Sequence, residues 1–268
     1  MSTYREVVEN HYESDADLHG LGPSSTMADE IVRTKEIDGI RACFAEVSTR
    51  QSNLSALEIG CGNGYLLSLL RPEFPQIHFT GIDYTEKMVD LAKSRNLADV
   101  DVSRGDVTNL KFPNARFDVV ISERVIINLL DRADQDRAFA EVARVLKPDG
   151  WFLCIEAFTT PLANINAART ELQMPEIRPP HHNRWFSDEE WNAFTASRFE
   201  IVSPSAVSAK LPEPNFLSTH YFATRVFHDL LRPEGGAIRN THFGRFFSAT
   251  LPNYGDYAPV KFYILRRL

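Results

Sequence analysis

The chain has 268 residues, of which 43% are hydrophobic, and it carries a formal net charge of −7. That length fits one large α/β domain, or one such domain with a cap. No apolar run is long enough to cross a membrane, and the acidic balance lacks the broad basic surface that nucleic-acid binding needs. We therefore expect neither a membrane nor a nucleic acid as partner.

The cysteines and the N-terminus indicate a compartment. Cys43, Cys61 and Cys154 are odd in number, widely spaced and set among apolar neighbours. The first twelve residues lack the apolar segment of a secretory signal. This pattern predicts reduced, buried thiols in a cytoplasmic protein, with no spacing typical of a metal site. The oligomeric state stays open, and a homo-oligomer is one possibility.

Residues 1–50 are predicted to form an N-terminal arm and lid helices, ahead of a main domain over 51–268. Residues 1–24 are polar. From Met27 to Val47 the apolar residues then recur at helical spacing. Thr26 with Asp29 fits a capping box at the start of this helix. Two interpretations stay open for the helix: it covers the sheet, or it joins the arm in a lid over the ligand site.

Apolar segments alternate with helical patterns over the first part of the main domain, and this alternation predicts a parallel sheet. Strands are expected at 56–59, 76–84, 100–102, 117–122 and 151–157, and later at 199–202 and 260–265. Substrate-side insertions are expected at about 158–190 and 205–258. They include helices near 162–172, from Ser187 and over 218–231, followed by a glycine- and aromatic-rich loop. Tyr221, Phe222 and Phe227 recur at helical spacing, which predicts core positions.

A glycine-rich turn joins the first strand to the next helix. The run from Glu58 reads Glu-Ile-Gly-Cys-Gly-Asn-Gly, with glycines at alternate positions. Glycine permits sharp turns and close approach of a ligand, and a helix N-terminus offers free N–H groups. Asp83 ends the second strand, Asp106 follows the third, and Lys147-Pro148-Asp149-Gly150 precedes the fifth. All lie at the strand ends where open α/β sheets bind ligands.

In this order, the four features resemble the class I S-adenosylmethionine-dependent methyltransferases over about residues 50–157, and by position over 260–265. The resemblance implies a doubly wound, seven-stranded Rossmann-like sheet and S-adenosylmethionine as cofactor. It also implies that Asp83 binds the ribose, that Asp106 binds the adenine amino group, and that the Val107 N–H meets a ring nitrogen. The implied cofactor-binding set is Gly60, Cys61, Gly62, Gly64, Asp83, Tyr84, Met88, Asp106, Val107 and Glu123.

Other classes match less well. A nicotinamide-dependent oxidoreductase needs Gly-x-Gly-x-x-Gly, but Tyr65 occupies the position of the third glycine. A methyltransferase-like scaffold without activity should have lost some of the glycines or acids. Enzymes that methylate nucleic-acid bases carry Asn/Asp-Pro-Pro-aromatic after the fourth strand, where this chain has Ser122-Glu123-Arg124-Val125.

The segment 178–186 (Arg-Pro-Pro-His-His-Asn-Arg-Trp-Phe) follows the fifth strand and is the predicted acceptor-side element. His182, or His181 beside it, is the predicted general base. Arg124, Arg178 and Arg184 are predicted to hold a polar or anionic acceptor. An ordinary solvated loop is the alternative. A metal site is not favoured, because adjacent histidines seldom converge on one ion.

The predicted reaction is O-methylation of a small polar metabolite. A faint resemblance to methyltransferases of bacterial polysaccharide pathways ranks a sugar or sugar-phosphate precursor first. N-methylation of an amino sugar or another small amine is the alternative within the enzyme class.

Overall fold

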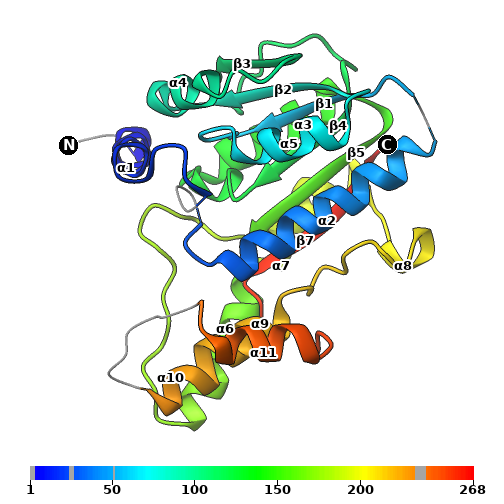
Figure 1. Ribbon diagram of the computed structural model, residues 1–268. Helices are drawn as coiled ribbons and strands as arrows, with labels where there is room; N and C mark the ends of the chain where they lie inside the picture. Colours follow the sequence, from blue (N-terminus) through cyan, green and yellow to red (C-terminus); the bar gives the residue numbers. More distant parts are fainter. Residues whose placement is uncertain (1–3, 24–26, 51, 233–239) are drawn as a thin grey trace.

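The computed structural model describes residues 4–23, 27–50, 52–232 and 240–268. Its centre is a seven-stranded sheet in the order β3-β2-β1-β4-β5-β7-β6 (Figure 1). The first five strands are parallel, and β7 runs antiparallel to β5 and β6. The predicted doubly wound, seven-stranded sheet is confirmed. The strands are β1 Ser55–Ile59, β2 His78–Asp83, β3 Val100–Arg104, β4 Phe117–Glu123, β5 Leu146–Ala157, β6 Phe199–Ile201 and β7 Val260–Arg267.

Helices lie on both faces of this sheet and beyond its end (Figure 1). They are α1 Tyr4–His19, α2 Glu30–Ser48, α3 Tyr65–Glu73, α4 Glu86–Ser94, α5 Arg132–Val145, α6 Thr159–Glu171, α7 Asp188–Thr195, α8 Pro204–Val207, α9 Ser218–Phe222, α10 His228–Leu231 and α11 His242–Thr250. A 3₁₀ turn spans Ile126–Asn128, and a π-helical segment, Ala223–Phe227, joins α9 to α10. The boundary at residue 50 and the insertion limits stay predictions.

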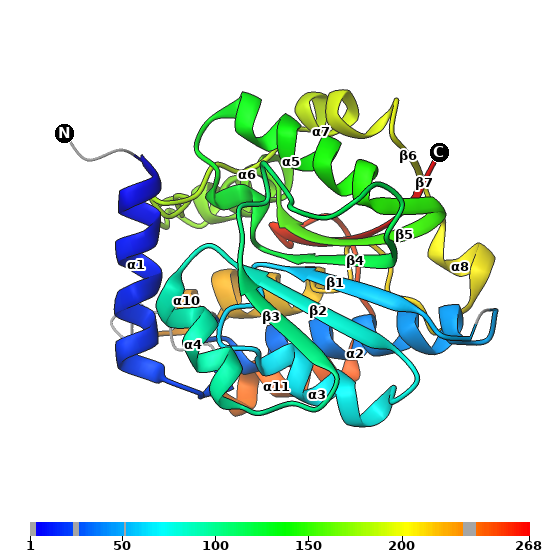
Figure 2. The same ribbon diagram turned by 90° about the horizontal axis from the view of Figure 1, so that it is seen from above.

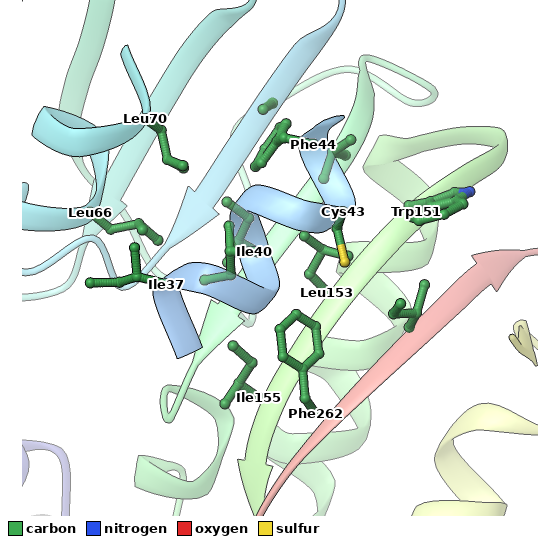
Figure 3. Packing of buried hydrophobic residues seen from close by; sticks show 14 of the residues in the cluster. Ile37, Ile40, Cys43, Phe44, Leu66, Leu70, Trp151, Leu153, Ile155 and Phe262 are labelled. Atoms are coloured by element: carbon green, nitrogen blue, oxygen red, sulfur yellow. The ribbon is translucent and has the colours of Figure 1, made fainter. Parts of the chain in front are cut away.

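Helix α2 is part of the core. Its Ile37, Ile40 and Phe44 are buried in one hydrophobic cluster with Leu66 of α3, Leu153 of β5 and Phe262 of β7 (Figure 3). The ring of Phe44 also meets Phe79 of β2, with 5.6 Å between the ring centroids. Gly39 lets the helix approach closely, because a Cβ there would lie 2.8 Å from Cε1 of Phe262. Of the two interpretations left open for this helix, covering the sheet describes it. The helix begins at Glu30 with Asp29 as its N-cap, and the predicted cap Thr26 lies outside the described residues.

The opposite face of the sheet carries α5 and α7 over a cluster of aromatic rings. Phe139 of α5 stacks on Phe194 of α7 with 5.5 Å between ring centroids, and it also meets Phe152 of β5. Ser187 and Glu190 form the predicted capping box at the start of α7. Phe186 is buried in the same cluster and fixes the end of the acceptor-side segment 178–186.

Helices α6, α9, α10 and α11 form a cap beyond the end of β5 (Figure 1). The prediction of a loop after residue 231 is wrong over 242–250, because α11 forms there with Thr241 as its N-cap. The core prediction is wrong for Phe227, which is 42% exposed. Tyr221 is half-buried and packs against the core cluster, in agreement with the prediction. Phe227 instead lies in the cap, where its ring meets Phe222 and Phe247.

Two further observations concern the described residues. No helix among them combines the length and the apolar character required to cross a membrane. Cys43, Cys61 and Cys154 are buried and free, as predicted.

Candidate functional site

Two adjoining cavities open at the edge where the parallel strands end. The cavity with more total empty space, named the larger cavity, has about 1060 Å³ with its open mouth included. It lies between the glycine-rich turn, the ends of β2, β3 and β4, and α1. Figure 2 shows α1 standing across this edge of the sheet. The helix lines the larger cavity with Tyr4, Arg5, Val8 and Tyr12. Of the N-terminal elements, α1 therefore lies over the site while α2 packs beneath the sheet.

The glycine-rich turn takes a shape that only glycine adopts easily. Gly60 and Gly62 have φ values of 64° and 52°, in the left-handed region that other residues rarely enter. A Cβ on Gly60 would lie 2.3 Å from Cγ2 of Val125. The N–H of Gly62 donates to Oδ2 of Asp83 at 2.8 Å, and the N–H of Thr85 donates to Oδ1 at 2.9 Å. The acid that ends β2 therefore fixes the turn that follows β1.

Gly64 does not line the larger cavity, whereas all the other predicted cofactor-binding residues do. It is the N-cap of α3, with φ 72°. A Cβ at this position would lie 3.0 Å from Cβ of Ala92. The missing side chain of Gly64 thus allows α3 to approach α4.

Both carboxylate oxygens of Asp106 accept hydrogen bonds. Its Oδ1 accepts from the N–H and Oγ1 of Thr108 at 2.8 and 2.7 Å, and its Oδ2 accepts from Nη1 of Arg5 on α1. Burial raises the pKa of Asp106, but the hydrogen bonds from Thr108 and Arg5 outweigh burial and lower it. The residue predicted to bind adenine is therefore also the residue to which the arm attaches.

A buried group of charges surrounds Arg124, which lines both cavities. Arg124 pairs with Glu36 and, at 3.5 Å, with Glu123, which also lies 3.4 Å from Nη1 of Arg33. Burial raises the pKa of Glu36. Burial acts on Glu123 in the same sense, but Arg33 and Arg124 lower the pKa of Glu123.

Glu58, the first residue of the glycine motif, lines the larger cavity beside these charges. It is 3% exposed. Its Oε2 has no hydrogen-bond partner among the described residues. Burial raises the pKa of Glu58 well above its usual range. Because a buried carboxylate oxygen without a partner is costly, this position favours a ligand that brings a cationic donor.

The smaller cavity encloses about 760 Å³, mouth included, between α1, residues 180–185, α9 and the adjoining ends of β5 and β7. His182 of its wall stacks on His11 of α1 at a centroid distance of 3.9 Å. Burial, with His11 and His181 nearby, lowers the pKa of His182 to about 4. Its Nδ1 is buried and has no partner among the described residues. Tyr12 and Arg124 line both cavities.

The structure brings together only some of the predicted acceptor-side residues. His182 and Arg124 line the smaller cavity, whereas His181 and Arg178 are exposed and lie outside both linings. Arg184 donates to Gln135 at 2.6 Å and pairs with Glu190. These contacts tie the acceptor-side segment to α5 and α7. They favour a structural position for Arg184, and its predicted substrate role stays untested.

Several wall residues were missed by the sequence analysis. Asn128 donates from Nδ2 to the hydroxyl of Tyr12 and to the carbonyl of Arg124, each at 2.9 Å. Because that carbonyl only accepts, it fixes the orientation of the Asn128 amide. Glu58 was not among the predicted cofactor-binding residues, although its position as the first residue of the glycine motif was a signal that it lies at the cofactor site. No local pattern points to His11, Tyr12 or Asn128, because their elements meet only in the folded chain.

A family model described as a methyltransferase domain matches residues 56–150. This range contains the glycine-rich turn, Asp83, Asp106 and the turn before the last part of β5. The chain belongs to the class I S-adenosylmethionine-dependent methyltransferase family. The resemblance in the sequence is thereby confirmed, together with the cofactor that this methyltransferase family uses.

Relatives of this chain are named for different substrates. A fatty-acid O-methyltransferase of Mycolicibacterium smegmatis is 36% identical over 38% of this chain and 36% of its own length. A demethylmenaquinone methyltransferase of Lactobacillus johnsonii is 28% identical over 51% of this chain and 59% of its own. The chain thus spans less than two thirds of these relatives.

Among solved structures, the cyclase SpnF is similar with a TM-score of 0.59 and 23% identity, over 99% of this chain and 96% of that one. This likeness concerns the fold alone. One fold can host different chemistries, so the likeness to SpnF assigns no activity to this chain.

The larger cavity fits S-adenosylmethionine. The unpartnered Oε2 of Glu58 suits the ammonium of the cofactor, and Arg33 in the same wall suits its carboxylate. The carboxylate of Asp83 lines the same cavity and accepts backbone N–H groups on both oxygens. A carboxylate has about four acceptor positions, so it can also accept a ribose hydroxyl. The left-handed glycines leave room beside the turn.

Proposed function

We propose that this protein transfers a methyl group from S-adenosylmethionine to an oxygen of a small molecule bound in the smaller cavity. The observation that carries the proposal is the shared wall: Tyr12 and Arg124 line both cavities. A cofactor in one cavity and an acceptor in the other would therefore meet at these two residues. Holding two reactants in line supplies much of the rate enhancement in such a displacement.

The chain contributes binding, orientation and a proton acceptor. Bound S-adenosylmethionine would supply an electrophilic methyl group. Asp83, Asp106 and Glu58 hold the cofactor through its ribose, its adenine and its ammonium. His182 lies in the acceptor wall with an unpartnered Nδ1, which supports the predicted role of a general base there. Helix α1 covers both cavities and limits the access of water.

The experiment measures cofactor binding first. Calorimetry with S-adenosylmethionine should show binding to the wild type, and Asp83→Ala should weaken it by about ten- to a hundredfold. Losing a charged hydrogen-bonding partner costs about 1.5–3 kcal/mol. Asp101→Ala, which removes an exposed carboxylate of the neighbouring strand β3, is the control and should bind as the wild type does.

Activity is then measured as transfer of a labelled methyl group to acceptors of several classes. Products labelled on oxygen support the proposal. Products labelled only on amines favour the N-methyltransferase alternative. Absence of cofactor binding by the wild type, or tight binding of a nicotinamide cofactor instead, overturns the proposed function. Cofactor binding without labelling of any acceptor class favours a scaffold or another chemistry.

A further inference from the structure

The segment that follows α1 is bound to the glycine-rich turn by one side chain. Gly20 comes directly after the helix, with φ 51°. Nδ2 of Asn63 donates to the carbonyl of Gly20 at 2.8 Å and to that of Gly22 at 3.0 Å. Asn63 is the last residue before Gly64 in the motif, and it is only 3% exposed. Both amide hydrogens of this buried residue are therefore used on the end of the arm.

A third contact of Asn63 fixes the orientation of its amide. Oδ1 accepts from the N–H of Tyr65, the first residue of α3, at 3.1 Å. A backbone carbonyl only accepts and a backbone N–H only donates, so the reversed amide would lose all three contacts. Among side chains of this length, only asparagine offers one acceptor and two donors together. These contacts account for the residue type at this position, and none of them involves a ligand.

Arg95, which caps the C-terminal end of α4, binds the same segment. Its Nη2 donates to the carbonyl of Leu21 at 2.7 Å, and its Nε donates to the carbonyl of Asn63 at 2.6 Å. The three carbonyls of residues 20–22 thus accept from Asn63 and Arg95, and we name this group the arm contact. Arg95 is not among the residues that line either cavity. Its part in the arm contact can therefore be changed without changing a cavity wall.

Helix α1 depends on such an attachment because little of it is buried. Among its described residues only Ala16 is buried. Its ion pair between Asp17 and Lys87 joins side chains that are 67% and 46% exposed, and exposed pairs contribute little to stability. The hydrogen bonds of Asn63 join uncharged groups, so salt does not screen them as it screens ion pairs.

We propose that Asn63 is a positioning residue for methyl transfer. Through the carbonyls of Gly20 and Gly22 it holds the end of α1, and α1 carries Tyr12 in the wall shared by the two cavities. The turn beside the cofactor is thereby joined to the helix that covers the cofactor. Release of α1 opens the larger cavity, and the bound cofactor then dissociates faster. The effect on the cofactor rests on the proposed function, whereas the attachment of α1 is measurable without any ligand.

The first test removes the donor of Asn63 and keeps its acceptor. Asn63→Asp has almost the same size and still offers an oxygen to the N–H of Tyr65, but its second oxygen faces the two carbonyls and repels them. Hydrogen exchange of the ligand-free full chain, followed by mass spectrometry, should show amides of α1 exchanging at least tenfold faster. Amides of α3 should exchange no faster, because a carboxylate at a helix N-terminus is favourable.

A second variant changes the arm contact from outside the cavities. Arg95→Leu removes the donor to Leu21 and should make α1 exchange at least threefold faster. Arg71→Leu is the matched control, because Arg71 donates in the same way to the carbonyl of Ala98 and to Asp99, at 2.8 and 2.7 Å. It should leave the exchange of α1 unchanged. Wild-type exchange of α1 in both Asn63→Asp and Arg95→Leu, or equal acceleration in α1, α2 and α3, overturns the proposal.

The effect on the site is measured as the dissociation rate of S-adenosylmethionine in stopped-flow experiments. Asn63→Asp and Arg95→Leu should raise this rate about tenfold and about threefold, in the order of their effects on α1, and Arg71→Leu should not raise it. Both arm-contact variants make the surroundings of the larger cavity more negative. Charge alone would then slow the dissociation of a ligand with a sulfonium cation. Faster dissociation therefore reports the loss of α1.

The two readouts separate the possible failures. If the wild type does not bind S-adenosylmethionine, the proposed function fails, and the exchange of α1 still decides whether Asn63 holds the helix. If the cofactor binds and neither α1 exchange nor cofactor dissociation changes in the two variants, cofactor binding stands and the role of Asn63 fails. If α1 exchanges faster but the cofactor dissociates as in the wild type, Asn63 holds the helix without positioning it for the site, which also overturns the proposal.

Discussion

His182 should make the stability of this protein depend on pH. In the folded chain its pKa is about 4, because of burial and the nearby His11 and His181, against 6.5 for an ordinary histidine. Between these two pH values the unfolded chain binds more protons than the folded one. The free energy of unfolding should therefore fall as the pH drops from about 6.5 to about 4.

Urea unfolding of the cofactor-free protein across this pH range measures the effect. His182→Asn should remove part of the slope, since asparagine does not titrate. Identical slopes for His182→Asn and the wild type would show that His182 is not held neutral by the fold.

Single residues also mark the limit of what the sequence predicted. Asp83 and the glycines of the turn are recognisable because a local backbone shape demands them. Arg184 looked equally functional, yet its guanidinium meets Glu190 and Gln135. Which carboxylate reaches an arginine depends on how distant elements pack. No spacing in the sequence carries that information.

At the scale of elements, Gly64 should be needed for packing more than for cofactor binding. Gly64→Ala places a residue with a Cβ at φ 72°, which costs about 1–2 kcal/mol. It also brings that Cβ to 3.0 Å from Ala92 of α4. The free energy of unfolding should fall by at least this amount, while the affinity for S-adenosylmethionine changes less than about threefold.

Chemical denaturation and calorimetry on the same samples separate the two quantities. The double variant Gly64→Ala/Ala92→Gly relieves the contact but keeps the φ cost and adds a helix-interior glycine, about 1 kcal/mol. The free energy of unfolding lost in the double variant is compared with the sum of the losses in the two single variants. A smaller loss than this sum supports a steric contact between α3 and α4. A tenfold loss of affinity at unchanged stability would place Gly64 in the cofactor site instead.

The elements themselves were predictable where burial is uniform along the chain. Strand β4 and the part of β5 from Trp151 to Ala157 are apolar runs covered on both faces, and the sequence located both. The prediction that Lys147–Gly150 precede the fifth strand is wrong, because β5 already begins at Leu146. Helix α11 was missed, because its glycine and aromatic residues do not favour a helix on their own. It is held by ring contacts, such as Phe243 on Phe247 at 4.7 Å and Phe227 on Phe247 at 6.4 Å. The smaller cavity was missed for a related reason: it is assembled from separate segments.

At the scale of the whole molecule, α1 is attached to the sheet domain largely by charged contacts. Arg5 pairs with Asp106, Glu9 with Arg104 at 2.9 Å, and Asp17 with Lys87 at 2.8 Å. Among its described residues only Ala16 is buried. Salt shortens the screening length from about 10 Å at about 0.1 M to about 3 Å at about 1 M. We therefore expect α1 to detach more often at high salt.

Hydrogen exchange followed by mass spectrometry tests this attachment. Amides of α1 should exchange faster at high salt than at low salt, because exchange reports local opening. Amides of α2, which packs in the core, provide an internal control and should not change. Equal protection of α1 at both salt concentrations would mean that its few apolar contacts hold it.

The placement of α1 has a consequence for how two ligands are bound. The helix supplies Tyr4 and Arg5 to one cavity, His11 to the other and Tyr12 to both. The first ligand to bind bears the loss of conformational entropy on ordering this helix, and the second meets a wall already in place. Cofactor and acceptor should therefore bind with positive heterotropic cooperativity. Linkage makes this reciprocal, so each ligand tightens the other by the same factor.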